Sequence, residues 1–125
     1  MAYSSRIKDG TIDELFEAIL LLENEEECYR FFEDICTVGE IKAIAQRLDV
    51  AKMLDEEQIY TDIVEKTGAS TATISRVKRS LYFGADGYRL ILDRLQQKKS
   101  GEKKYALKDT TAKKFAVNNS ADDDK

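Results

Sequence analysis

A short stretch near residue 70 combines small hydroxyl and methyl side chains with basic ones. It reads Ser70-Thr-Ala-Thr-Ile-Ser-Arg-Val-Lys-Arg79 and follows a glycine, Gly68. Small side chains let a helix approach base edges in the major groove of duplex DNA, while Lys and Arg bind the neighbouring phosphates. The candidate DNA contacts are Thr61, Ser70, Thr71, Ala72, Thr73, Ser75, Arg76, Lys78 and Arg79.

Two kinds of contact are expected from this set. The side chains that we expect to reach bases are Thr71, Ala72 and Ser75. Those that we expect to reach phosphates are Thr61, Arg76, Lys78 and Arg79, with Arg89 lying nearby. On charge alone, a solvated helix surface is the plainer interpretation.

A helix-turn-helix at about residues 60–81 would position these side chains. We expect a short helix over residues 59–66, a left-handed turn residue at Gly68, and a second helix from a cap at Ser70 or Thr71 to about residue 82. Ile63, Ile74 and Val77 would pack between the two helices. Helix pairs joined by a glycine turn are also common as plain structure in helical bundles, so the polar and basic outer face is what favours DNA binding.

The rest of the chain also predicts helices, over residues 11–22, 25–35, about 38–54 and about 86–97. Thr11-x-x-Glu14 and Thr37-x-x-Glu40 match the capping box that begins a helix. The side chains expected to face inward are Leu15, Ile19 and Leu22, then Cys28, Phe31, Phe32 and Ile35, and finally Leu90, Ile91 and Leu95. Residues 1–10 are expected to form a flexible N-terminal arm and residues 98–125 a disordered tail, which leaves one helical domain over residues 11–97.

Composition narrows the fold and removes several chemistries. The 125 residues include no proline, no tryptophan and only six glycines, which disfavours a turn-rich β fold. We therefore expect an all-α protein of six helices. The chain has no histidine, so a His-based catalytic triad or zinc site is excluded. No phosphate-binding glycine loop, metal cluster or acid–base pair is evident either, and we expect no enzyme.

The two cysteines and the absence of long apolar runs indicate the compartment. Cys28 and Cys36 would lie about 12 Å apart in one helix, too far for a disulfide, and we expect reduced thiols in core or half-buried positions. No apolar run reaches membrane-spanning length, and no signal-peptide core is present at the N-terminus. The expectation is a soluble cytoplasmic protein that binds neither metal nor membrane.

Charge is distributed unevenly along the chain. Residues 1–69 contain 7 basic and 17 acidic residues, a net charge of −10, whereas residues 70–99 contain 7 basic and 2 acidic residues, a net charge of +5. A basic block within an acidic chain favours a polyanion as partner. The acidic half leaves open an alternative function, a helical dimeric adaptor that binds another protein.

The stretch Gly68-Ala-Ser-Thr-Ala-Thr-Ile-Ser-Arg-Val-Lys-Arg-Ser-Leu81 resembles the DNA-reading segment of the Trp repressor family. The likeness extends over about residues 11–97 and includes the Thr37-x-x-Glu40 cap with Ala43, Arg47 and Leu54. It is similar most of all to the YerC/YecD branch, which consists of small proteins of Gram-positive bacteria. The resemblance implies an all-helical, intertwined homodimer that represses transcription. Its two helix-turn-helix heads would bind half-sites about 34 Å apart in a palindromic operator.

The resemblance also implies a candidate ligand pocket at Arg47, Arg76 and Ser80, the positions that match the family's tryptophan contacts. Val77 departs from the family pattern, which has a glycine against which the indole ring lies. Valine adds three heavy carbons there, and overpacking of this kind costs roughly 1–3 kcal/mol, about 10- to 100-fold in affinity. We therefore expect no tryptophan and no cofactor, and the sequence names no other effector.

Overall fold

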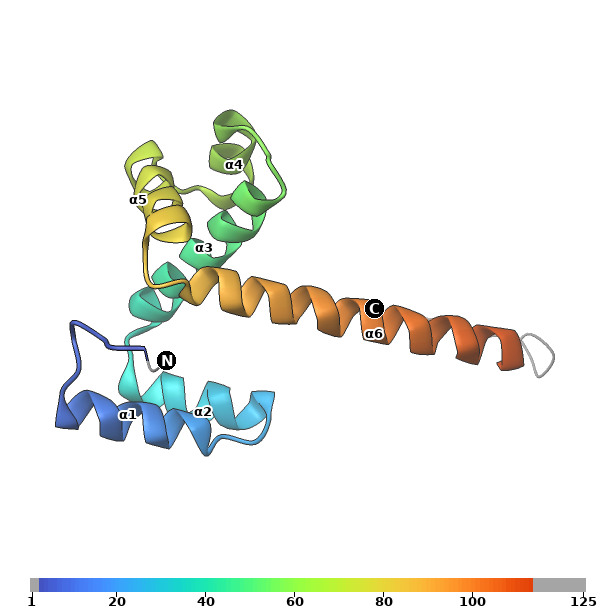
Figure 1. Ribbon diagram of the computed structural model, residues 1–125, viewed down its shortest axis with the longest axis horizontal. Helices are drawn as coiled ribbons and strands as arrows, with labels where there is room; N and C mark the ends of the chain where they lie inside the picture. The colour runs from blue at the N-terminus through green and yellow to red at the C-terminus, as the bar shows by residue number, and fades with distance from the viewer. Residues whose placement is uncertain (1–2, 114–125) are drawn as a thin grey trace. The chain divides into compact units, whose positions relative to one another are not determined.

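The computed structural model describes residues 3–113, with side chains described over residues 3–102. The described chain contains six helices and no strand, which confirms the all-α prediction (Figure 1). The helices are α1 (Gly10–Leu20), α2 (Glu25–Ile35), α3 (Val38–Asp55), α4 (Tyr60–Thr67), α5 (Thr71–Phe83) and α6 (Gly87–Lys113). The chain divides within α3 into two compact units, Met1–Gln46 and Arg47–Lys125.

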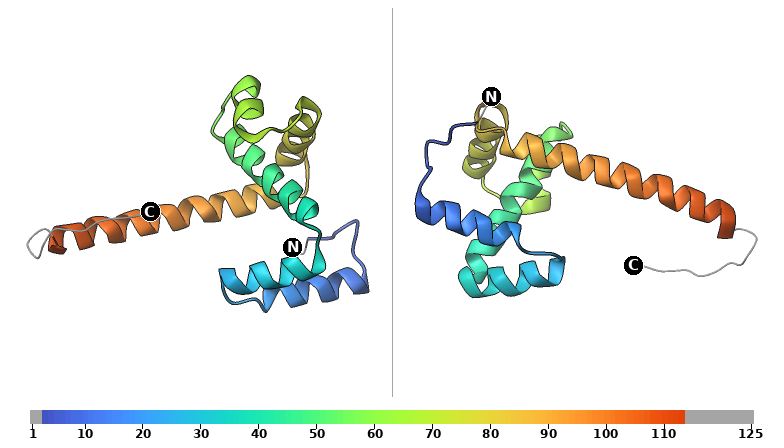
Figure 2. Two further views of the ribbon diagram at one scale, coloured as in Figure 1. Left: turned by 180° about the vertical axis from the view of Figure 1, so that it is seen from behind. Right: turned by 60° about the horizontal axis from the view of Figure 1, so that its bottom comes forward.

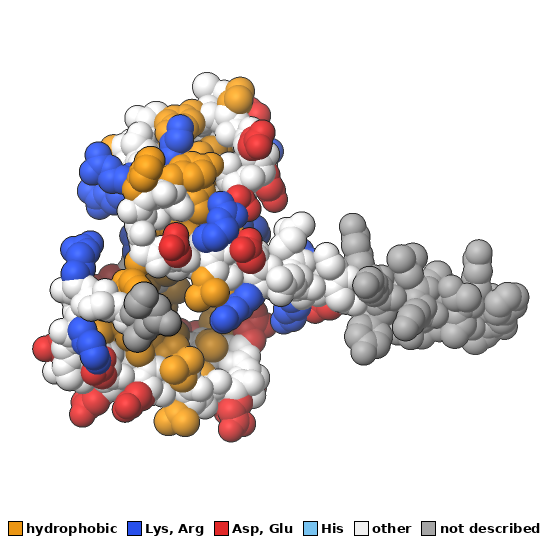
Figure 3. All heavy atoms as spheres, in the orientation of Figure 1, with side chains coloured by type: hydrophobic (Ala, Val, Ile, Leu, Met, Phe, Trp, Pro, Cys, Tyr) orange, Lys and Arg blue, Asp and Glu red, His pale blue; other side chains and the backbone are white. Residues whose placement is uncertain are grey.

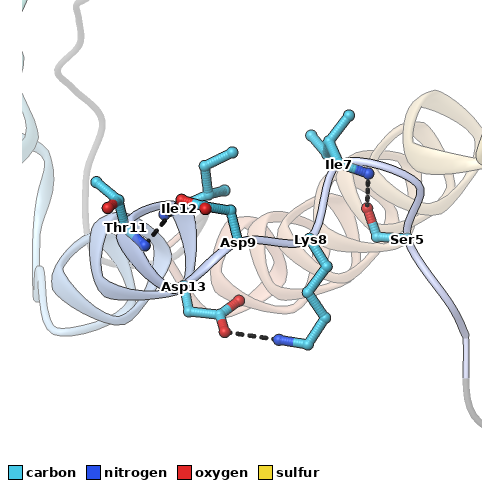
Figure 4. Close-up of polar contacts among 7 residues, drawn as sticks. All are labelled: Ser5, Ile7, Lys8, Asp9, Thr11, Ile12 and Asp13. Atoms are coloured by element: carbon cyan, nitrogen blue, oxygen red, sulfur yellow. Dashed lines mark hydrogen bonds and ion pairs between the residues drawn. The ribbon is translucent and has the colours of Figure 1, made fainter.

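The first helix begins earlier than predicted because a better cap lies upstream. The Asp9 carboxylate accepts hydrogen bonds from the backbone N–H groups of Thr11 and Ile12 at 3.0 and 3.4 Å (Figure 4). Aspartate is preferred over threonine at this position, and its charge suits the positive end of the helix dipole. The predicted capping box at Thr11 is therefore wrong, since Thr11 lies inside the first turn. Lys8 extends the local network by pairing with Asp13 at 2.6 Å (Figure 4).

The capping box that begins α3 is confirmed in both directions. The backbone N–H of Glu40 donates to Thr37 Oγ1 at 3.1 Å, and the backbone N–H of Thr37 donates to Glu40 Oε1 at 2.8 Å. At the start of α2, Asn24 Oδ1 accepts from the backbone N–H of Glu27 at 2.9 Å. These side chains satisfy amides that have no partner within the helix, so each helix start is fixed by local sequence.

The unit Met1–Gln46 has no fully buried side chain among its described residues. Leu15, Ile19 and Leu22 of the first predicted stripe are half-buried, as are Phe31 and Phe32, whose rings meet edge to face at 5.5 Å. The inward positions predicted for Cys28 and Ile35 are wrong, because both side chains are exposed. Hydrophobic side chains reach the surface over α1 and α2 (Figure 3).

The unit Arg47–Lys125 contains the core of the protein. It brings together side chains from the C-terminal half of α3 and from α4, α5 and α6, which lie next to one another in the ribbon (Figures 1 and 2). The buried residues are Val50, Ala51, Leu54, Ile63, Ala69, Ile74, Val77, Leu81 and Leu92. The predicted inward positions of Ile63, Ile74 and Val77 are thus confirmed.

The last helix differs most from the prediction. α6 runs from Gly87 to Lys113, so residues 98–113, which we expected to lie in the disordered tail, are helical. This stretch has no proline, and its Lys, Glu, Ala and Leu residues all favour a helix, although its polar composition is also typical of disorder. Residues 114–125 lie outside the described residues. Leu92 is buried and Leu95 half-buried, whereas Leu90 and Ile91, both predicted to face inward, are exposed.

Candidate nucleic-acid interface

Helices α4 and α5 are joined by a turn whose geometry depends on Gly68. This residue has a φ of 75°, a left-handed conformation that glycine adopts without cost, and its N–H donates to the Val64 carbonyl at 2.8 Å. Thr67 Oγ1 donates to the Ile63 carbonyl at 2.7 Å and accepts from the N–H of Ala69 at 3.1 Å. The turn is therefore closed by hydrogen bonds on both sides of the glycine, as a helix-turn-helix requires.

A hydroxyl cap begins α5. Ser70 Oγ accepts from the backbone N–H of Thr73 at 3.1 Å and donates to Thr73 Oγ1 at 3.1 Å. Of the two capping residues that the sequence left open, Ser70 is the cap and Thr71 is the first helical residue. Ser70 and Thr73, two of the candidate DNA contacts, therefore also fix the start of α5.

One side of α5 is buried and the other faces outward. Ile74, Val77 and Leu81 pack into the core together with Ile63 of α4, and Val77 is only 1% exposed. The exposed side chains of the helix include Thr71, Ala72, Ser75, Arg76 and Arg79. The structure therefore brings the predicted small and basic residues together on one outward surface of one helix.

The basic side chains around this surface differ in their partners. Lys78 Nζ lies 5.7 Å from the ring centroid of Tyr60, a cation–π contact that holds Lys78 beside the N-terminus of α4, next to the exposed Thr61. Among the residues that the structure describes, Arg76 and Arg79 form no ion pair. Their charges are free to meet an anion, and basic side chains lie over α5 in Figure 3.

Arg89, expected near phosphates, is instead engaged within the protein. Its Nη1 lies 2.8 Å from Asp55 Oδ1 and 3.7 Å from Asp93 Oδ1. The hydrogen bond to Asp55 raises the pKa of the guanidinium above its usual value, and the charges of the two carboxylates add to the effect. Arg89 thus links α6 to the end of α3. No local sequence pattern connects it with Asp55, and the Tyr60 contact of Lys78 was likewise missed, because both pairings arise from tertiary packing.

The candidate ligand residues come from two helices. Arg76 and Ser80 are exposed one turn apart on α5, and Arg47 is exposed on α3. Val77, at the position where the family resemblance has a glycine against the indole ring, is buried in the core. Over residues 3–102 no group of three or more ligating side chains could hold a metal ion. No helix in the described part of the chain is long and apolar enough to cross a membrane.

Comparison with known proteins assigns the fold. The sequence model of the Trp repressor protein matches residues 10–96. The chain belongs to the Trp repressor family. This family consists of DNA-binding transcription regulators rather than enzymes, and membership confirms the resemblance on which the expected fold and function rested.

Individual relatives of this Trp repressor family member support the same conclusion. The uncharacterized protein YerC of Bacillus subtilis strain 168 is 53% identical over 92 residues, which are 74% of this chain and 88% of YerC. A candidate Trp repressor from Staphylococcus aureus is 56% identical, with a TM-score of 0.71 over 74% of this chain and 96% of its own. A TrpR-like protein from Eubacterium eligens is 55% identical, with a TM-score of 0.71 over 73% of this chain and 94% of its own.

Proposed function

We propose that the protein is a sequence-specific transcriptional regulator, acting as a repressor, that binds a palindromic operator as a homodimer. The observation that carries the proposal is the outward face of α5, where small side chains lie together with two arginines that pair with no described carboxylate, on a helix whose opposite face is buried. A helix of this kind can enter the major groove with its N-terminal residues first. Repression would follow from occupation of a promoter, in a cytoplasmic protein.

The proposed contacts divide by chemistry. Thr71, Ala72 and Ser75 reach base edges, where small hydroxyl and methyl groups permit close approach. Thr61, Arg76, Lys78 and Arg79 bind phosphates from both helices of the head. Ser70 and Thr73 contribute at the N-terminus of α5, where backbone N–H groups favour an anion such as phosphate.

The homodimer is supported by the exposed apolar side chains of the unit Met1–Gln46. Leu20 and Leu21 are 83% and 79% exposed, and Phe16, Ile35 and Ile44 are about half exposed. Apolar surface of this extent on a soluble chain marks an interface. A second copy that interlocks through this unit would cover it and would present two heads to two half-sites about 34 Å apart.

The test is selection of duplexes by the purified full chain without added ligand. Genomic fragments that the protein retains are sequenced, and Thr71→Arg serves as the variant that blocks the groove while leaving the core untouched. We expect a shared palindrome with the natural sequence and none with the variant. The absence of any enriched sequence from the natural protein would overturn the proposal.

The alternative, an adaptor that binds a protein through its acidic half, predicts different behaviour. Binding to duplex DNA should weaken with salt at a slope of about −0.9 per phosphate contact, and Arg79→Ala should reduce that slope by about one contact. Binding through the acidic half should survive Arg79→Ala. We also propose a ligand pocket at Arg47, Arg76 and Ser80. Its occupant is not tryptophan, because the Val77 side chain stands where the indole ring would lie.

A further inference from the structure

The centre of the outward face of α5 is a methyl group. At about 100° per residue, Ala72 lies opposite the buried stripe formed by Ile74, Val77 and Leu81. Thr71, its neighbour at the first helical position, is also exposed. The part of α5 that enters a groove first therefore carries two exposed side chains with methyl groups, Thr71 and Ala72.

Two of the hydroxyl groups at the same helix start, those of Ser70 and Thr73, are hydrogen-bonded within the protein. Ser70 Oγ accepts a hydrogen bond from the backbone N–H of Thr73 and donates one to Thr73 Oγ1, each at 3.1 Å. Thr73 is half-buried. Neither of these two hydroxyls is therefore placed to act as the main donor to a base, and the exposed methyl groups of Thr71 and Ala72 lie beside them in the first turn.

Only one base offers an apolar partner in the major groove. Thymine carries a C5 methyl group there, whereas the other bases present hydrogen-bond donors and acceptors. We propose that Thr71 and Ala72 recognise thymine through its methyl group, so that the specificity of the head depends on T·A pairs at the centre of each half-site. The inference rests on the proposed function and adds the class of base that the head reads.

Arg76 and Arg79 are not expected to recognise bases in place of Thr71 and Ala72. Arg76 and Arg79 lie about 1.7 and 2.5 turns beyond the Ser70 cap of α5, whereas recognition helices contact bases mainly with their N-terminal residues. At these positions their long side chains reach the phosphates that border the groove. Guanine recognition by either arginine is the competing outcome.

The test uses the duplex enriched from genomic fragments and a copy in which deoxyuridine replaces thymidine in each half-site. This exchange removes the methyl group and leaves Watson–Crick pairing intact. We expect binding to weaken about fourfold for each recognised methyl group that is removed, or about 15-fold for one thymine in each of two half-sites. A second copy with 7-deazaguanine, which lacks the N7 acceptor, should bind as the unmodified duplex does.

A matched pair of variants assigns the effect to α5. Thr71→Val keeps a methyl group at the Cγ2 position and removes the hydroxyl, whereas Thr71→Ser keeps the hydroxyl and removes the methyl group. We expect Thr71→Val to keep the sensitivity of binding to deoxyuridine, whatever its affinity for the thymidine duplex. Thr71→Ser should bind the thymidine duplex more weakly and should lose part of that sensitivity. Thermal unfolding of each variant confirms that the fold is intact.

The outcomes separate this inference from the proposed function. Full affinity for the deoxyuridine duplex, or loss of affinity with 7-deazaguanine alone, would overturn thymine recognition while the DNA-binding function stood. If no duplex is enriched at all, the proposed function fails and this inference fails with it.

Discussion

At the residue scale, Gly84 ends α5 at a place where no side chain fits. A Cβ built on Gly84 would lie 2.4 Å from the carbonyl oxygen of Ser80, whereas nothing lies within 4 Å of a Cβ built on Gly87. The neighbouring backbone atoms cannot give way without disturbing the end of the helix. We predict that Gly84→Ala lowers the free energy of unfolding by about 1–3 kcal/mol. Urea denaturation measures this loss of stability, with Gly87→Ala as the matched control. Equal stability of the two variants would show that a Cβ at residue 84 does not collide with the Ser80 carbonyl.

A second residue-scale prediction concerns Val77, which is 1% exposed and packs in the core with Ile74 and Leu81. Its side chain occupies the position at which the family resemblance would place an indole ring. We predict that calorimetric titration of the natural protein with tryptophan gives no binding heat, because the ring would have to displace a packed side chain. Measurable binding at micromolar concentrations would show that the steric argument is wrong. Val77→Ala, by contrast, should destabilise the fold by about 1–3 kcal/mol through the cavity it leaves.

At the element scale, the starts of α1 and α3 are fixed by different side chains. Thr37 and Glu40 cap α3 reciprocally, whereas Asp9 rather than Thr11 caps α1. We predict that Thr37→Ala and Asp9→Ala each cost about 1 kcal/mol of stability, and that Thr11→Ala costs much less. Thr37→Ser keeps the hydroxyl and should behave as the natural protein does in the same denaturation experiment. A cost at Thr11 equal to that at Asp9 would restore the capping box expected from the sequence.

The same elements show what sequence could and could not predict. Helix positions, the Gly68 turn and the buried stripe of α5 follow from local rules of periodicity, capping and glycine conformation, and the structure confirms them. The end of α6 was missed because helix propensity competes with a polar composition that favours disorder. The Arg89–Asp55 pair and the exposure of Leu90 depend on tertiary packing, which no local pattern contains. Candidate base contacts could be selected from the sequence alone, but their DNA contacts stay predictions.

At the scale of the whole molecule, α6 continues well beyond the part of the chain that packs in the core. Its last side chain against the core is Leu95, and the Trp repressor match ends at residue 96. We predict that removing residues 100–125 shifts the midpoint of thermal unfolding by less than about 3 °C, since none of the side chains described after Leu95 is buried. Scanning calorimetry of the natural and shortened chains measures the shift. A larger decrease would mean that the C-terminal part of α6 packs against protein.

We expect dimerisation to bury the exposed apolar residues of the unit Met1–Gln46. Leu20 is 83% exposed, and full burial of a leucine stabilises by about 1.5–3 kcal/mol. In a symmetric interface each such residue is buried twice, once in each copy. We predict that sedimentation equilibrium gives the mass of a dimer for the natural chain and that Leu20→Glu shifts the equilibrium toward the monomer. Glu17→Gln, which alters the same helix at an exposed acidic position, should leave the dimer intact.

Because two linked heads bind a palindrome far more tightly than one, Leu20→Glu should also weaken binding to the enriched duplex. A monomeric natural chain with full affinity for that duplex would contradict the proposed assembly.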